Sequence, residues 1–183
     1  MKNILMTSIL FTAGVVLADS KPFKGKVHVI PGTIEAEHYD EGKPGVAYVD
    51  LDPQNQGANY REKTQVDIEK RPDASNGHGI GWTRKGEWLN YTVEVKAAGT
   101  YTIEMPVASN KMGGLFHLEI GGKAITKAIR IPDTVGWDKL KLIKCAGVKL
   151  AIGRHVICVV MDEQGPSGSI GDIDYFKFVK NSK

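Results

Sequence analysis

The chain has 183 residues, of which 24 are basic and 21 acidic, so its formal net charge is only +3. This length fits one domain, and a hydrophobic content of 42% is enough for a packed core, which excludes a chain that is mainly disordered. Basic and acidic residues are interleaved, without the concentrated basic stripe that is typical of proteins that bind nucleic acid.

The first 18 residues have the pattern of a secretory signal peptide. A basic start at Lys2 is followed by an apolar run over 4–17 and by a small residue, Ala18, at a plausible cleavage point. The run is shorter than the ~20 residues that span a bilayer, and no later segment is long and apolar enough to do so. We therefore expect a cleaved leader at 1–18, a single mature domain at 19–183, and a protein that is secreted, periplasmic or held at the cell surface.

Export would permit a disulfide bond between the two cysteines, Cys145 and Cys158. They lie on two successive apolar segments, and neither belongs to a CxxC or Cys–His pattern of the kind that binds metal. Two free, buried thiols are the alternative, because an unpaired cysteine packs as a small hydrophobic residue. The sequence leaves both possibilities open.

Apolar residues recur at every second position, the period of a β-strand, through most of the mature chain. The clearest case runs through Leu89, Tyr91, Val93 and Val95. The predicted strands cover 88–95, 101–108, 116–120, 123–131, 139–149, 155–161 and 170–178, with a short one at 66–69 and long polar loops over the rest of 50–76. Short strands separated by Gly, Asn or Pro about every ten residues are typical of a β-sandwich, so we predict an all-β fold.

Motifs of common catalytic sites are absent from the sequence. It has no GxSxG, P-loop, GxGxxG or HExxH pattern, and its five histidines share no metal-ligand spacing. Carboxylates are plentiful, and a glycosidase needs only two of them on either side of a cleft. The residue pattern alone therefore leaves a small hydrolase open.

Two acidic pairs have a spacing that suits a calcium site. Glu35 and Glu37 share one face of a predicted strand, and so do Asp172 and Asp174 near the other end of the chain. Clustered carboxylates repel one another unless a cation lies between them, and Ca²⁺ takes six to eight oxygen ligands. If the first and last strands are adjacent, the pairs would form such a site; two solvated acidic edges are the alternative.

Ten short motifs occur in the order and spacing of a known family. The most extended are Ile-Glu-Ala-Glu at 34–37, Gly-Glu-Trp-Leu-Asn-Tyr-Thr-Val at 86–93 and Asp-Ile-Asp-Tyr-Phe at 172–176. Over residues 30 to 179 the chain resembles carbohydrate-binding module family 6. The resemblance implies a jelly-roll β-sandwich of the galactose-binding-domain-like type and no catalytic activity. It also implies a structural Ca²⁺, binding of a plant or algal type of polysaccharide (the xylan, β-glucan or agarose class), and separate glycoside hydrolases as partners.

The resemblance also assigns roles to individual residues. The calcium ligands would be Glu35, Glu37, Asp174 and the backbone carbonyl of Arg61. The walls of the glycan cleft would be Trp82 and Trp137, with Asp172 and Tyr60 at its polar edge. Asp172 stands where the family commonly has Asn, and a carboxylate only accepts hydrogen bonds whereas an amide also donates.

The settings of the tryptophans agree with these roles. Trp82 and Trp137 each follow a glycine, as residues of loops or strand ends often do, although core packing is the alternative. Some family members also bind glycan on a sheet face near the position of Trp88, but we expect Trp88 in the core, because large aromatic residues in strands are mostly buried.

Two other classes of function stay open. One is a small secreted glycoside hydrolase with a carboxylate pair such as Asp67 and Glu69. The other is a calcium-dependent cell-surface adhesion protein whose ligand is a protein.

Overall fold

The computed structural model describes residues 20–58 and 60–182 of the chain. The predicted leader at 1–18 lies outside the described residues. Within the described ranges the secondary structure is almost wholly β, and no helix there is long and apolar enough to cross a membrane.

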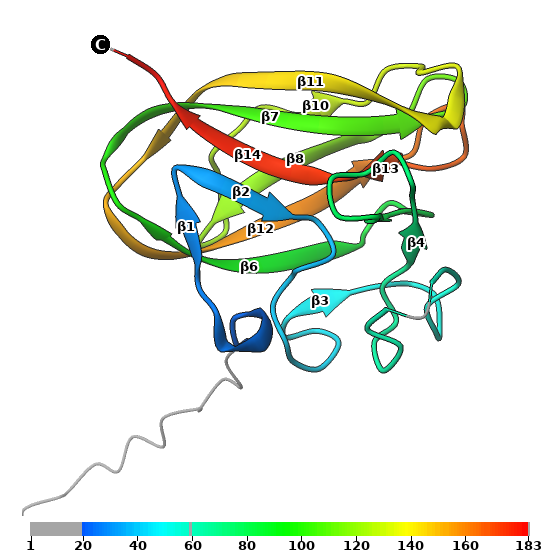
Figure 1. Cartoon of the computed structure of the whole chain (residues 1–183), viewed down its shortest axis with the longest axis horizontal. Helices are drawn as coiled ribbons and strands as arrows, with labels where there is room; N and C mark the ends of the chain where they lie inside the picture. Colours follow the sequence, from blue (N-terminus) through cyan, green and yellow to red (C-terminus); the bar gives the residue numbers. More distant parts are fainter. Residues whose placement is uncertain (1–19, 59, 183) are drawn as a thin grey trace, which may run out of the picture.

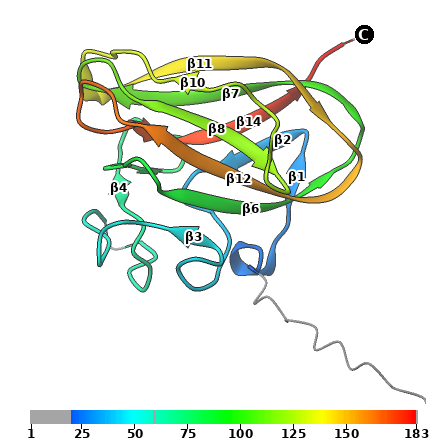
Figure 2. The same cartoon turned by 180° about the vertical axis from the view of Figure 1, so that it is seen from behind.

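The strands form two packed sheets (Figures 1 and 2). In chain order the elements are the short 3-10 helix η1 (Phe23–Gly25), β1 (His28–Ile30), β2 (Gly32–Glu35), β3 (Tyr48–Val49), β4 (Ile68–Lys70), β5 (His78–Ile80), β6 (Trp88–Val95), β7 (Gly99–Ser109), β8 (Leu115–Ile120), β9 (Lys123–Ala124), β10 (Ile129–Arg130), β11 (Gly136–Leu150), β12 (Gly153–Glu163), β13 (Asp172–Ile173) and β14 (Tyr175–Lys180). The first sheet has the order β1-β6-β12-β8-β10, with β3 beside β6 and β9 beside β8. The second has the order β2-β14-β7-β13-β5-β4, with β11 beside β7. The predicted all-β sandwich is confirmed.

The core lies between the sheets and is made by the alternating apolar positions. The buried residues include Tyr91, Val93, Phe116, Leu118, Ile157 and Val159 from the first sheet and Ile34, Ile103, Met105, Val107, Phe176 and Phe178 from the second. Side chains alternate across a strand, so one face of each sheet is buried and the other is left for solvent or ligand. The first and last strands are adjacent, since β2 pairs with β14.

Two predicted strands are interrupted. The strand predicted at 170–178 is divided into β13 and β14, with Asp174 between them. Residues 123–131 form the two short strands β9 and β10, each paired only with β8. The hydroxyl of Thr126 accepts the hydrogen bond of the Leu118 N–H at 3.0 Å. A side-chain oxygen thus takes the place of a backbone carbonyl, and the ladder breaks there.

The two cysteines lie on different sheets and are free. Cys145 on β11 is paired with Ile103 and packs partly against the core. Cys158 on β12 lies between Asn90 and Glu119 and lines a hollow on the outer face of the other sheet. A disulfide between them is therefore wrong, because the core separates the two strands.

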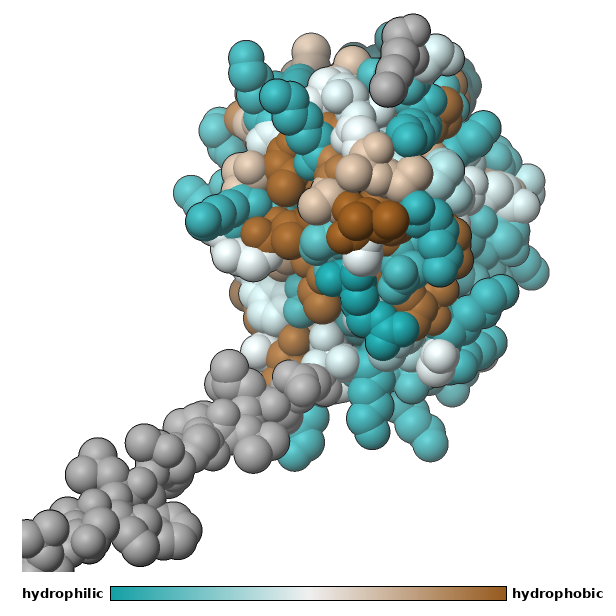
Figure 3. Space-filling view, turned by 90° about the vertical axis from the view of Figure 1, so that its left-hand side faces the viewer, coloured by the Kyte–Doolittle hydropathy of each residue, from teal (hydrophilic) through white to brown (hydrophobic). Residues whose placement is uncertain are grey.

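The two ends of the sandwich differ. Loops before β6, before β11 and before β13 gather at one end, beside β4 (Figure 1). At the opposite end, which faces the viewer in Figure 3, apolar side chains reach the surface. They include Val29, which is 47% exposed and paired with Glu94 near the end of β6. Another is Ile152, which is 66% exposed and precedes Gly153, a partner of Val95. The exposed tryptophans lie at the loop-rich end.

Candidate functional site

A cleft of about 520 Å³ opens at the loop-rich end of the sandwich. It is lined by Asp52, Glu69, Trp82, Arg84, Trp137, Ser167, Gly168, Ser169 and Asp172. The side chains of Trp82 and Trp137 are 49% and 37% exposed, so neither ring packs in the core. The structure brings three of the four predicted cleft residues together: Trp82, Trp137 and Asp172.

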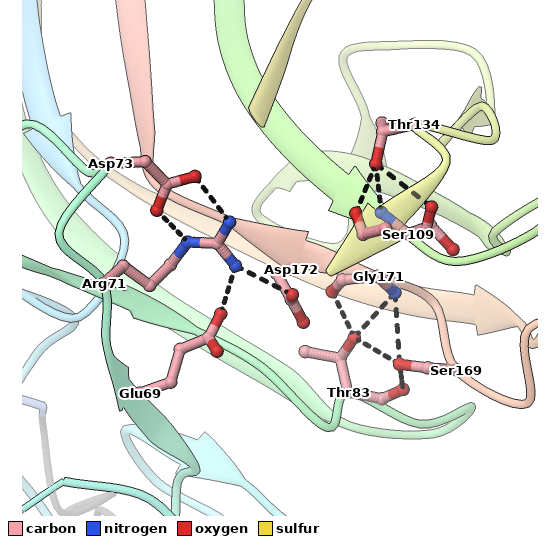
Figure 4. Close-up of polar contacts among 10 residues, drawn as sticks. Glu69, Arg71, Asp73, Thr83, Ser109, Thr134, Ser169, Gly171 and Asp172 are labelled. Atoms are coloured by element: carbon pink, nitrogen blue, oxygen red, sulfur yellow. Dashed lines mark hydrogen bonds and ion pairs between the residues drawn. The ribbon is translucent and has the colours of Figure 1, made fainter. Parts of the chain in front are cut away.

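Trp82 is held out of the core by its backbone and by its neighbours. Its φ is +49°, in the left-handed region that a non-glycine residue adopts only when its surroundings enforce it. The next residue, Thr83, is buried: its hydroxyl donates to the Gly171 carbonyl at 2.7 Å and accepts from the Gly171 N–H at 3.1 Å (Figure 4). Ser169 Oγ also donates to the Thr83 carbonyl at 2.8 Å. These contacts fix the Trp82 loop to the segment that enters β13.

Trp137 is positioned by the turn before β11. The hydroxyl of Thr134 accepts from the Ser109 N–H at 2.9 Å and lies 2.8 Å from the Gly136 carbonyl. Thr134 is itself buried, so this turn is anchored to the end of β7. The second wall of the cleft therefore rests on the core sheet.

A buried arginine organises the polar edge of the cleft (Figure 4). The guanidinium of Arg71 donates to Asp73 through Nε at 3.1 Å and Nη2 at 3.0 Å. Its Nη1 donates to Glu69 at 2.5 Å and to Asp172 at 2.9 Å. The backbone makes room for this cluster at Gly81, where an added Cβ would lie 3.1 Å from Asp172 Oδ1. Glu69 and Arg71 were not predicted as cleft residues, because nothing local in the sequence indicates that β5 joins β4 to β13 in one sheet.

The carboxyl group of Asp172 has a raised pKa. Burial raises its pKa well above the ordinary value, and the neighbouring charge of Glu69 raises it further, while Arg71 opposes both effects. A carboxylic acid that keeps its proton donates as well as accepts hydrogen bonds. Asp172 can thus do part of what the usual amide does.

Tyr60 does not line the cleft with Trp82. Its hydroxyl lies 2.8 Å from Nε2 of His38, and its ring stacks on His78 with 4.6 Å between centroids. Burial raises the pKa of this phenol, and the negative charge of Glu37 raises it further. Tyr60 therefore lies beside the carboxylates of the predicted metal site.

The expectation that Trp88 packs in the core is wrong. Its side chain is only partly buried, because side chains alternate along β6 and position 88 points away from the core. Leu89 is the first residue of β6 whose side chain points into the core. It lines a second hollow of about 410 Å³ on the outer face of the first sheet, together with Asn90 and Val160. A tryptophan thus lines hollows both at the loop-rich end and on the outer face of the first sheet.

The structure brings Glu35, Glu37 and Asp174 together at the junction of β2 and β14. Ser75 Oγ donates to Glu35 at 2.7 Å and to Asp174 at 3.0 Å, and Asn76 donates to Glu37. The second oxygen of Glu37, Oε2, is buried and has no hydrogen-bond partner.

This cluster has the donor set of a calcium site. Burial raises the pKa of Glu37 from 4.5 to about 7, and repulsion by Glu35 and Asp174 adds to the rise. Burial also raises the pKa values of Glu35 and Asp174. A cation would remove this repulsion and would give the unpartnered Glu37 oxygen a ligand, which is chemistry that Ca²⁺ supplies. As they stand, the three carboxylates are held by Ser75 and Asn76 and do not converge within 4.8 Å as the oxygens of Asp50, Asp52 and Asp67 do.

Arg61, the fourth predicted ligand, makes different contacts. Its carbonyl accepts hydrogen bonds from the N–H and the hydroxyl of Thr64 at 2.9 and 2.8 Å. Its guanidinium donates to the carbonyls of Glu37 and Asp40 at 3.0 and 3.1 Å. In the described contacts, Arg61 supports the backbone around Glu37, and its carbonyl does not join the three carboxylates.

A further acidic cluster was not singled out from the sequence. Asp50, Asp52 and Asp67 each place one carboxylate oxygen within 4.8 Å of the others. Asp67 accepts from the Gln56 N–H at 2.6 Å, whereas Glu69 faces Arg71 and the cleft. The pair Asp67 and Glu69 therefore does not flank one cleft, as a glycosidase pair would.

Replacing Thr83 with valine should destabilise the Trp82 loop. The valine leaves the buried Gly171 carbonyl without its hydroxyl donor, a loss worth about 1–3 kcal/mol. We expect a lower melting temperature and weaker binding at the cleft, measured by calorimetry. Thr33→Val, at an exposed position of β2, is the matched control; equal melting temperatures for the two variants would contradict this role.

Comparison with known proteins gives the same family by sequence and by structure. Residues 56–180, more than half of the chain, match the family described as carbohydrate binding module (family 6). A module of this family from Cellvibrio mixtus lichenase 5A, solved with cellotriose, shares 25% identity at a TM-score of 0.60 and covers 83% of this chain and 98% of its own. A β-1,3-glucan-binding family 6 module from Bacillus halodurans shares 22% identity at a TM-score of 0.62, covering 84% and 98%.

Two curated relatives match a shorter segment. Beta-agarase AgaA of Microbulbifer thermotolerans is 35% identical over 83 residues, which are 45% of this chain and 18% of the relative. Clotting factor G alpha subunit of Tachypleus tridentatus is 29% identical over 86 residues, 46% of this chain and 13% of the relative. The match thus covers less than a fifth of either relative.

Proposed function

Because this chain belongs to family 6 of the carbohydrate-binding modules, we propose that it binds a plant or algal type of polysaccharide, of the xylan, β-glucan or agarose class, without cleaving it. The observation that carries the proposal is the pair of exposed indole rings, Trp82 and Trp137, on one cleft. Buried, hydrogen-bonded carboxylates lie beside them.

The cleft offers both surfaces that a sugar ring requires. A pyranose has an apolar face of C–H groups, which packs on an indole, and a rim of hydroxyls, which needs hydrogen-bond partners. Asp172 and Glu69 supply these partners from a rigid position, since both are held by Arg71. Ser167 borders the cleft with its hydroxyl on the opposite loop, whereas the hydroxyl of Ser169 already donates to a backbone carbonyl.

The relatives support a neutral chain as the ligand. One related module was solved with cellotriose, another binds β-1,3-glucan, and a curated relative is a β-agarase. Titration of the protein with lichenan, laminarin, xylan and agarose oligosaccharides tests the proposal. We expect saturable binding to at least one of them, competed by the free oligosaccharide; no binding to any would contradict it, and binding of a protein without competition by sugar would favour an adhesion protein.

The protein should release no sugar from any of these polysaccharides. The cleft holds Glu69 but not Asp67, so it lacks the one carboxylate pair that the sequence suggested for hydrolysis. Reducing-sugar assays should stay at background over a day. Sugar release that is abolished by Asp67→Asn or Glu69→Gln would show that the chain is a hydrolase.

A structural calcium completes the proposal. Glu35, Glu37 and Asp174 would hold it and so connect β2 to β14, the first and last strands of the second sheet. Bound there, the cation would neutralise three buried or partly buried carboxylates and so stabilise the folded protein. It would not contact the glycan in the tryptophan cleft, because that cleft is lined by other residues.

The pattern of residues 1–18 supports export, so we place the mature protein outside the cytoplasm or at the cell surface. A polysaccharide-binding protein there would bring separate glycoside hydrolases to the same substrate.

A further inference from the structure

The polar edge of the cleft is acidic, although the whole chain carries a formal charge of +3. Its ionisable groups are the carboxylates of Asp52, Glu69, Asp73 and Asp172 and the guanidinium groups of Arg71 and Arg84. Four carboxylates against two guanidinium groups leave two net negative formal charges. With Asp172 neutral, one negative charge remains.

Both guanidinium groups have carboxylate partners, but they are not engaged to the same degree. Arg71 is only 3% exposed, and four of its five N–H groups already donate to carboxylates. Arg84 is 36% exposed; its Nη2 lies 2.7 Å from Asp52 and its Nε lies 3.6 Å from Glu87, but neither atom makes a hydrogen bond. Hydrogen bonds therefore hold Arg71, whereas Arg84 is held only by charge pairing.

Glu69 is the carboxylate that a ligand meets most directly. Its side chain is 19% exposed, against 6% for Asp172. It also lines a smaller hollow of about 340 Å³ beyond Trp137, where Lys70 is a positively charged lining residue. Arg71 holds it in place, which prevents it from turning away from an incoming charge.

We propose that Glu69 is a specificity-determining residue, which lets the cleft accept neutral glycans and reject chains that carry carboxylate or sulfate groups. This inference rests on the proposed function. A carboxylate on the sugar would meet the fixed charge of Glu69 at short range, in a partly desolvated cleft whose carboxylates outnumber its guanidinium groups.

Two derivatives of one glucan test the charge alone. The glucan that binds best is converted into hydroxyethyl and carboxymethyl forms of equal, low substitution, at which the hydroxyethyl form still binds like the parent glucan. The two substituents are similar in size and differ in charge. We expect the carboxymethyl form to bind about five- to tenfold more weakly at low salt. The difference should narrow at 0.5 M salt, where the Debye length is about 4 Å, against about 30 Å at 0.01 M.

Substitution assigns the effect to one side chain. Glu69→Gln should reduce the difference between the two derivatives to about twofold or less, since it removes the charge and keeps the shape. Glu94→Gln makes the same change in total charge on β6, near the opposite end of the sandwich, and should keep the full difference. Circular dichroism checks that both variants fold.

The possible results separate the two claims. If the wild-type protein binds both derivatives equally, at any salt concentration, the role of Glu69 is wrong and glycan binding stands. A Glu69→Gln variant that discriminates like the wild type overturns that role as well. If the wild-type protein binds none of the underivatised xylan, β-glucan and agarose chains, the proposed function itself is wrong.

Discussion

Replacing Trp82 or Trp137 with alanine is expected to weaken glycan binding about tenfold to a hundredfold while the domain stays folded. Stacking of a flat ring on an aromatic side chain is worth roughly 1–3 kcal/mol in the analogous case of nucleic-acid bases, and 1.4 kcal/mol is one decade of affinity. Both rings are substantially exposed, so their removal leaves no cavity in the core. The cost in stability should be about 0.5 kcal/mol.

Trp88 provides the comparison for this pair. It is the one other tryptophan of the chain and lies on the outer face of the first sheet. Titration calorimetry with the best oligosaccharide, together with thermal melting, should separate the three alanine variants. If the Trp82 and Trp137 variants fold and bind like the wild type and Trp88→Ala does not, the glycan binds on the sheet face instead.

Removal of calcium with EDTA is expected to lower the melting temperature by about 5–15 °C. A ligand present at a hundred to a thousand times its Kd stabilises by about 2.7–4.1 kcal/mol, and 1 kcal/mol shifts the melting temperature by about 2–4 °C in a protein of this size. Calorimetric melting of the protein with calcium and with EDTA measures the shift. Equal melting temperatures, with no metal found by elemental analysis, would contradict the proposed site.

The decrease in melting temperature caused by EDTA should become larger from pH 5 to pH 8. In the metal-free protein the pKa of Glu37 is raised from 4.5 to about 7, so its folded state holds a proton more tightly than its unfolded state. The stability that this proton gives is present below pH 4.5 and is lost as the pH rises through about 7. Calcium needs the ionised carboxylates and therefore binds better at the higher pH.

Glu37→Gln distinguishes a metal ligand from a structural acid. The amide is neutral, so the metal-free variant should be at least as stable as the metal-free wild type at pH 8, and its response to calcium should be much smaller. Glu62→Gln, at an exposed position, is the matched control and should respond like the wild type. A Glu37→Gln variant with an undiminished response to calcium would show that Glu37 is not a ligand.

The fold could be predicted from the sequence largely because its strands obey a period of two. The residues Leu89, Tyr91, Val93 and Val95 alternate on β6, and all four are buried. The prediction failed where side chains replace backbone contacts, as Thr126 does at the break between β9 and β10. It left the cysteines undecided between a disulfide and two free thiols, because periodicity does not indicate which sheet a strand joins; the structure has both free, on different sheets.

The site was predicted in part. The two cleft tryptophans follow glycines, and this local signal was sufficient to place them on loops. Glu69 and Arg71 meet Asp172 only through the pairing of β4, β5 and β13, a long-range contact with no local signature. Trp88 was wrongly predicted in the core because the prediction relied on the size of its side chain. Its position next to Leu89, whose side chain points inward, places it on the outer face of the strand.

The indole N–H resonances of the three tryptophans test the central claim most directly. Each residue gives one cross-peak in a ¹H–¹⁵N spectrum, and single substitutions assign them. On titration with a bound oligosaccharide, the cross-peaks of Trp82 and Trp137 should shift together along one saturation curve, while that of Trp88 stays in place. A titration in which the Trp88 cross-peak shifts and the other two do not would contradict the account.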